Sequence, residues 1–170
     1  METSALAGCV QTANGHFAPA DIGLSYEARR LPEGWAELET IRQRRQLKRF
    51  LVPGRINVFV VGVIHDRHAS RATRRAAARA GFEPSGRLAG AHIPAEGRRP
   101  GTYVIISASH GSGMSLTHEL GHFFGVAHHR DPENIMSYGR RRSRFDETQL
   151  GTFRRKARKL RRVLRRPPRS

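Results

Sequence analysis

Three histidines and a glutamate lie within one short segment, residues 118–128, and their spacing suits a metal site. His118 and His122 would be one turn apart on the same face of a helix, so both imidazoles can reach one ion at about 2.0–2.1 Å. Glu119 would lie about 100° around that helix, where it can reach a metal-bound water but cannot complete the same face. The spacing therefore predicts two metal ligands and a general base.

A third ligand, His128, requires the chain to turn back. If the helix continued at about 1.5 Å per residue, His128 would lie roughly 15 Å beyond His118, too far to share one ion. Gly125 stands where the helix must end, because glycine adopts the left-handed conformation without a Cβ penalty. Three neutral imidazoles leave a fourth position for water, as in catalytic zinc sites, and the metal lowers the pKa of that water towards about 7. Glu119 can then accept its proton and pass it to a leaving amine.

Residues 118–128 match each fixed position of the pattern H-E-x-x-H-x-x-G-x-x-H, and Met136 follows as a Met-turn methionine. In these residues the chain resembles the metzincin clan of zinc metallopeptidases. A chance match of the five fixed positions has a probability on the order of 10⁻⁵. The resemblance implies a zinc endopeptidase with one catalytic Zn2+, which hydrolyses protein or peptide substrates. The implied ligands are His118, His122 and His128, with Glu119 as the catalytic base.

Tyr138 follows Met136 by two residues, the spacing at which some metzincin families place a tyrosine near the zinc. The resemblance implies that its hydroxyl either ligates the resting zinc or stabilises the oxyanion. The gap from His128 to Met136 is more similar to that of matrixins, which use no such tyrosine, so a packing role for Tyr138 stays open. We expect His129 to lie exposed or outside the ligand set. No second metal site is predicted from the histidines at 65, 68, 92 and 110.

The elements expected around this segment indicate an α+β fold. Residues 55–64 are β-branched and nearly continuously apolar, which is typical of a strand covered on both faces, and we expect them to form the central strand. The resemblance implies a metzincin-like zincin, with a mixed twisted sheet, an active-site helix, and a C-terminal helix after the Met-turn. The expected helices cover 4–14, all or part of 35–51, 69–80, 114–124 and 146–164, and the expected strands cover 22–28, 55–64, 89–93 and 102–106.

Two further features concern the ends of this arrangement. Asp146 and Gln149 have the spacing of a capping box at the start of the C-terminal helix, with Phe145 and Leu150 placed as its staple. In the metzincin clan an antiparallel edge strand lines the cleft and pairs with an extended peptide, and by order along the chain it corresponds to residues near 90–94. The clan's sheet also begins with a strand before its first helix, which is missing here. Either the fold is trimmed, or the natural product is longer, which would also explain the missing signal peptide and propeptide.

Length and composition bound the class of protein. The 170 residues suffice for one compact catalytic domain, which we predict over 1–166, followed by a short basic tail at 167–170. The single cysteine, Cys9, excludes an internal disulfide. The longest apolar stretch, residues 56–64, is too short for a transmembrane helix. No secretory signal is visible at the start of the chain, and the localisation stays open.

The formal net charge is +17, from 31 Lys and Arg against 14 Asp and Glu, and much of the excess follows Phe153. A field of this size favours nucleic acid, anionic membranes or acidic proteins. The alternative function is therefore a basic polyanion-binding protein with a vestigial zinc site, although the presence of Glu119 argues against a lost activity. We expect basic residues all around the C-terminal helix, with no aromatic stacking platform, and hence only weak, nonspecific polyanion binding.

Overall fold

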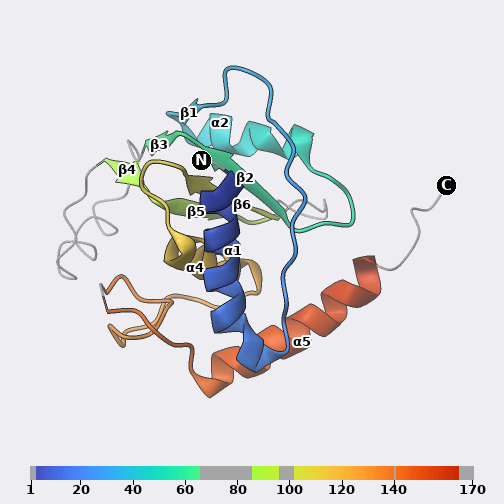
Figure 1. The fold of residues 1–170 in the computed structure, drawn as a ribbon, viewed down its shortest axis with the longest axis vertical. Coiled ribbons are helices and arrows are strands. Elements are labelled where there is room, and N and C mark those ends of the chain that lie inside the picture. Colours follow the sequence, from blue (N-terminus) through green and yellow to red (C-terminus); the bar gives the residue numbers. More distant parts are fainter. Residues whose placement is uncertain (1–2, 66–85, 96–101, 140, 165–170) are drawn as a thin grey trace.

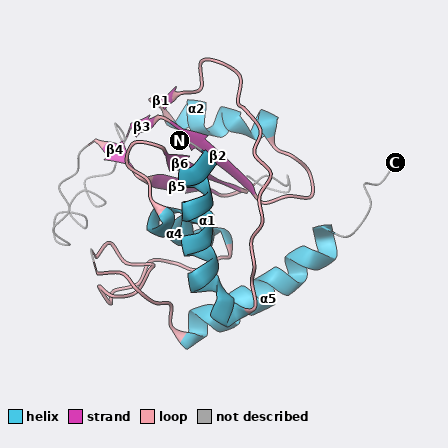
Figure 2. Cartoon of the chain, viewed as in Figure 1, coloured by secondary structure: helices cyan, strands magenta, loops and turns pink. Residues whose placement is uncertain are grey.

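The computed structural model describes residues 3–65, 86–95, 102–139 and 141–164, and it confirms the α+β fold class (Figure 1, Figure 2). The predicted helix at 69–80 and the predicted tail at 167–170 lie outside these residues. No helix in the described ranges is both long and apolar enough to cross a bilayer. The helices are α1 (Thr3–Phe17), α2 (Ile41–Gln46), α4 (Gly113–Phe123) and α5 (Glu147–Leu164), with the 3-10 turns η1 (Ala18–Ala20) and η2 (Leu47–Phe50).

Two small sheets are formed in the described ranges, with the strand orders β2-β6-β5 and β1-β3-β4. In the first, β6 is central, runs parallel to β2 and antiparallel to β5, and is buried along its whole length. The strands predicted at 89–93 and 102–106 are thus confirmed as β5 and β6. The strands are β1 (Glu37–Leu38), β2 (Asn57–Val61), β3 (Val63–His65), β4 (Arg87–Leu88), β5 (Gly90–Ile93) and β6 (Tyr103–Ser107).

The prediction that residues 55–64 form the central strand is wrong. This segment divides at Gly62 into β2, which lies at an edge of the first sheet, and β3, which belongs to the second. The backbone of Ala36 crosses closely at the division: its carbonyl accepts from the Val63 N–H at 3.0 Å, and a Cβ at Gly62 would lie 2.8 Å from its oxygen. The close contact with Ala36 lies where the apolar segment divides between the two sheets. The central strand of the first sheet is β6.

The strand predicted at 22–28 is also absent from the described structure, where residues 22–36 are irregular. The side-chain amide of Asn14 on α1 donates to the Leu24 carbonyl at 2.9 Å and accepts from the Leu24 N–H at 2.6 Å. The Asn14 side chain thus satisfies both backbone groups of Leu24 without a partner strand. The segment 35–51, expected to be helical in whole or in part, is partly helical: it contains α2 and η2, preceded by strand β1, with a Thr40–Gln43 capping box at the start of α2.

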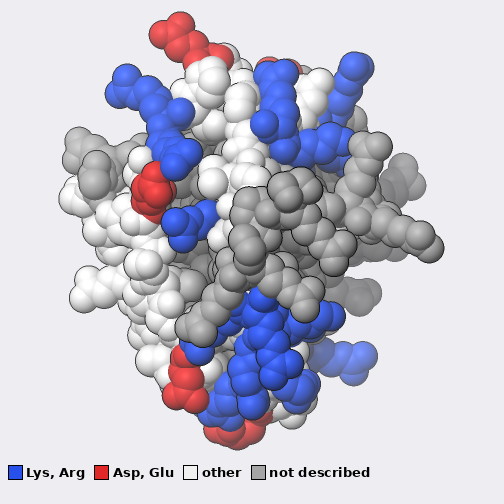
Figure 3. All heavy atoms as spheres, turned by 90° about the vertical axis from the view of Figure 1, so that its right-hand side faces the viewer, with Lys and Arg blue, Asp and Glu red and all other residues white. Residues whose placement is uncertain are grey.

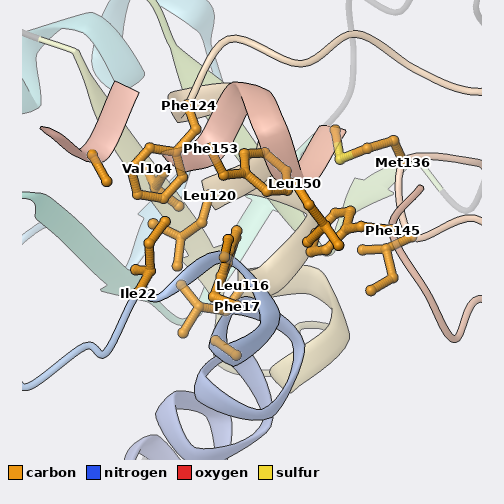
Figure 4. Packing of buried hydrophobic residues seen from close by; sticks show 14 of the residues in the cluster. Phe17, Ile22, Val104, Leu116, Leu120, Phe124, Met136, Phe145, Leu150 and Phe153 are labelled. Carbon is orange, nitrogen blue, oxygen red and sulfur yellow. The ribbon is translucent and has the colours of Figure 1, made fainter. Parts of the chain in front are cut away.

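An aromatic cluster joins the three longest helices. Phe17 at the end of α1 is fully buried, and its ring lies 5.5 Å from that of Phe124, 5.3 Å from that of Phe145 and 5.1 Å from that of Phe153 (Figure 4). α1 also approaches α4 closely, since a Cβ at Gly113 would lie 2.5 Å from the Thr12 Cβ. α4 is therefore held between α1, α5 and the sheet, which fixes the helix that carries the histidine motif.

The C-terminal helix α5 is amphipathic, contrary to the expectation that basic residues surround it. Phe153 and Ala157 are buried and Leu160 packs against the same core, so one face of α5 is apolar. The helix begins at the predicted capping box, in which Gln149 N–H donates to Asp146 Oδ1 at 2.8 Å and Asp146 N–H donates to Gln149 Oε1 at 3.0 Å. Its Lys and Arg side chains are confined to the remaining faces.

Candidate metal centre

Helix α4 presents the histidine motif on the side away from its core contacts. Ser112 caps the helix by accepting from the Ser115 N–H at 3.3 Å. Leu116 and Leu120 are buried in the core, and His118 lies about 200° around the helix from Leu116. The apolar residues therefore hold the helix against the core, and the histidines lie on another side of it.

The chain reverses direction at Gly125, whose φ of +90° lies in the left-handed region. α4 ends at Phe123, and the turn is closed by bonds from the Gly125 N–H to the His122 carbonyl at 2.9 Å and from the Val126 N–H to the Gly121 carbonyl at 3.1 Å. The following residues return along the helix end. This reversal brings His128 beside the first two histidines.

One ring nitrogen from each of His118, His122 and His128 lies within 4.8 Å of the other two, so these residues could hold one metal ion. The Nε2 atoms of His122 and His128 are 3.0 Å apart. Ligand atoms of a tetrahedral zinc with bonds of 2.0–2.1 Å are separated by about 3.3 Å. The separation of the His122 and His128 nitrogens is thus close to that of two ligands of one such ion.

The outer nitrogens of the first two histidines are held by backbone carbonyls. His118 Nδ1 lies 2.8 Å from the Ile135 oxygen, and His122 Nδ1 lies 2.8 Å from the Val126 oxygen. A carbonyl can only accept, so each Nδ1 carries the proton and each Nε2 keeps its lone pair for a metal. Burial lowers the pKa of His118 and of His128 to about 4 and also lowers that of His122, which keeps all three rings neutral at pH 7, as ligation requires.

Glu119 lies against strand β5. A Cβ at Gly90 would lie 2.7 Å from Glu119 Cγ, so the absence of a side chain at position 90 makes room for the glutamate. Burial raises the pKa of the Glu119 carboxyl to about 7, although a hydrogen bond from the His92 backbone N–H and the charge of Arg142 act in the opposite direction. This carboxyl can exchange a proton near neutral pH.

Met136 packs against helix α4 at Gly121, between His118 and His122 in the sequence. It is fully buried, and its Sδ lies so close to Gly121 that a Cβ there would be 2.3 Å away. Its N–H donates to Asn134 Oδ1 at 2.8 Å, and Asn134 Nδ2 donates to Gln149 Oε1 at 2.9 Å. The Met136 segment and the start of α5 are therefore one hydrogen-bonded unit. Sequence reasoning missed Asn134, because its role depends on a contact with a residue fifteen positions later.

The other histidines lie outside the ligand set. His129 is exposed, as expected, and its Nε2 lies 3.7 Å from Asp146 Oδ2. His92 on β5 has its ring 6.2 Å from that of His122, and its Nε2 is buried without a hydrogen-bond partner. In the part of the chain that the structure describes, no second group of three candidate metal ligands is found. His68, named with these histidines in the sequence analysis, lies outside that part.

Tyr138 contacts the third histidine from outside. Its hydroxyl lies 3.2 Å from His128 Nδ1, the nitrogen opposite the one that faces His122. Burial, followed by the charge of Glu119, raises the pKa of this phenol. The oxygen of a hydroxyl in this position can accept a hydrogen bond from the His128 Nδ1–H and so orient the ring.

Replacing Tyr138 with Phe should weaken zinc binding by about tenfold, because loss of a partner to a ligand's outer nitrogen typically costs 10–100-fold. Competition with a chromogenic chelator would measure the affinity, with Tyr26→Phe, an exposed tyrosine, as the matched control. If zinc affinity is unchanged while kcat falls, the hydroxyl acts on the substrate or the oxyanion instead.

Arg142, which was not among the predicted site residues, also lies at this site. Its Nη1 is 3.4 Å from His118 Nδ1.

No protein-family model, no curated protein and no solved structure matches the chain. The geometry of these side chains is therefore the basis for any statement about function.

Proposed function

We propose that the protein is a zinc-dependent endopeptidase of the metzincin type. The observation that carries this proposal is the convergence of three neutral imidazoles next to a glutamate that is not among the candidate ligands. The set of three histidines is that of catalytic zinc sites, in which a fourth position is open. When bound, zinc would polarise a water molecule and the scissile carbonyl. The match to the metzincin motif, with Met136 packed beneath the helix, supports the same reading.

The remaining chemistry would be done by the chain's own side chains. Glu119 would accept a proton from the attacking water and deliver it to the leaving amine, a task suited to a carboxyl whose pKa is about 7. Strand β5 lies at the edge of its sheet beside Glu119, and its outward backbone groups could pair with an extended peptide. A substrate bound in this way would pass in front of the histidines.

Zinc content and peptide cleavage, measured together, test this proposal. The purified protein should contain one equivalent of zinc and should cleave members of a peptide library at internal bonds. Chelation should abolish cleavage, and addition of zinc should restore it. Stoichiometric zinc without cleavage of any peptide would count against the peptidase and in favour of a structural or vestigial site.

Weak polyanion binding is a second candidate, favoured by the exposed side of α5. Basic side chains gather on the lower part of the face in Figure 3, at the level of α5 in Figure 1. Two basic side chains of α5 are bonded to the backbone, since Arg154 donates to the Pro19 carbonyl and Arg161 to the Asp21 carbonyl. The basic side chains of α5 that are exposed to solvent are Arg155, Lys156, Arg158, Lys159, Arg161 and Arg162.

If α5 binds polyanions, the triple variant Arg155→Gln, Arg158→Gln, Lys159→Gln should bind duplex DNA more weakly and with a lower salt dependence. Each lost phosphate contact reduces the slope of log K against log salt by about 0.9, so the slope should fall by about 2 to 3. Fluorescence anisotropy at several salt concentrations would measure it. A control variant neutralises three exposed residues elsewhere: Arg30, Arg42 and Lys48. Equal slopes for both variants would exclude α5 as the binding surface.

A further inference from the structure

Arg142 is a partly buried cation beside the histidine cluster. Its Nη1 lies 3.4 Å from His118 Nδ1, but that nitrogen already donates its proton to the Ile135 carbonyl at 2.8 Å. A nitrogen that carries a proton cannot accept a second one. The guanidinium therefore touches the ligand's ring without finding a hydrogen-bond acceptor in it.

No carboxylate in the described part of the chain forms an ion pair with Arg142. Its near neighbour Arg144, by contrast, pairs with Asp131 at 3.5 Å and with Glu133 at 3.0 Å. Glu119 acts on Arg142 through its charge, but that carboxyl is bonded to the backbone of β5. The Arg142 side chain is only partly exposed to solvent, so its cation has lost part of its hydration. A desolvated charge of this kind is normally compensated by a partner.

The position of Arg142 indicates what that partner is. The guanidinium lies beside Nδ1 of His118, the ring nitrogen turned away from a metal bound at Nε2, so it is not aimed at a carbonyl held by the metal. A group that paired with it would lie beside the metal centre and not on the metal itself. A planar guanidinium offers parallel N–H donors that match the two oxygens of a carboxylate.

We propose that Arg142 binds a substrate carboxylate beside the metal centre and makes the site selective for peptides that carry one there. The inference rests on the proposed peptidase function. The carboxylate can come from the C-terminus of a peptide or from an Asp or Glu side chain. Both present the same planar anion, and peptide pairs distinguish them.

Two peptide pairs test the proposal with the zinc-loaded protein. In one pair the C-terminus is a carboxylate or a carboxamide, and in the other a Glu near the cleaved bond is replaced by Gln. Binding is measured in the Glu119→Gln background by calorimetry, so that cleavage does not interfere, and kcat and KM are measured with Glu119 present. The charged member of one pair should bind about 10–100-fold more tightly than its neutral partner, as expected for a hydrogen bond to a charged group. The pair that shows this preference identifies the source of the carboxylate.

Substitution at position 142 should remove the preference selectively. Arg142→Met should weaken binding of the charged peptide to the level of the neutral one, raise KM for charged peptides alone, and leave zinc content unchanged. Arg142→Lys should retain part of the preference, and Arg141→Met, at an exposed position, should retain all of it.

The outcomes separate this proposal from the peptidase function. A charge preference without any cleavage would sustain the carboxylate site and count against the peptidase. Cleavage of charged and neutral peptides with equal KM would overturn the carboxylate site and leave the peptidase standing. Because the wild-type comparison needs no substitution, equal binding within both pairs overturns the proposal even if Arg142→Met fails to fold.

Discussion

Glu119→Gln should lower kcat for peptide cleavage by about 10²–10⁴-fold, the range that positioned acid–base groups supply. The amide has nearly the same shape as the carboxyl but cannot take a proton from water. The three histidines are unchanged, and Glu119 is not among the candidate ligands, so one equivalent of zinc should remain bound. Steady-state kinetics together with metal analysis would measure both quantities.

The matched control for this variant is Glu147→Gln, an exposed glutamate in the first turn of α5, which should leave kcat unchanged. A Glu119→Gln enzyme as active as the native one would contradict the assignment of the base. Loss of zinc from that variant would instead show that Glu119 contributes to the metal site itself.

Gly90→Ala should lower kcat by about 100-fold without loss of zinc. A Cβ at this position would lie 2.7 Å from Glu119 Cγ and 3.0 Å from Ile106 Cδ1, so the methyl group must displace one of them. Ile106 is buried on the central strand, which leaves the glutamate as the group that moves. A misplacement of about 1 Å in a catalytic group typically costs 10²-fold in rate.

A double-variant cycle makes this prediction specific. If Gly90→Ala acts only by moving Glu119, it should have no further effect on kcat in the Glu119→Gln background. Gly23→Ala is the control, since a Cβ there meets no heavy atom within 4 Å. An additional loss of rate in the double variant would mean that Gly90 acts on the sheet or on substrate pairing rather than on the base.

The elements that sequence patterns predicted well are those specified by local signals. α4 begins at a serine cap and α5 at the Asp146–Gln149 box, and both depend on residues within one turn of the helix start. The two errors in the strands have a different origin. At Gly62 the carbonyl of Ala36, from another segment, approaches the backbone where the apolar segment divides. At Leu24 the side-chain amide of Asn14, and not a neighbouring strand, bonds to the backbone. Apolar periodicity carries no information on such contacts between distant residues.

The same distinction applies to the candidate site. The spacing of the three histidines is local, and the structure brings their ring nitrogens together. Gly90 and Arg142 matter only because folding places them against Glu119 and His118. In the sequence Gly90 is one residue of an expected strand, and Arg142 is one arginine among several. Their roles became visible only in three dimensions.

The aromatic cluster around Phe17 has a consequence for the timing of assembly. Arg154 on α5 bonds to the Pro19 carbonyl across 135 positions, and Phe17 packs on Phe153 in the same region. Contacts between residues so far apart form slowly, because closing the long loop between them costs chain entropy before the contact can stabilise the structure. During synthesis α1 leaves the ribosome early but has no α5 to pack against until nearly the whole described chain has been made. The packing that supports the candidate metal site would therefore be completed late, when α5 docks against α1.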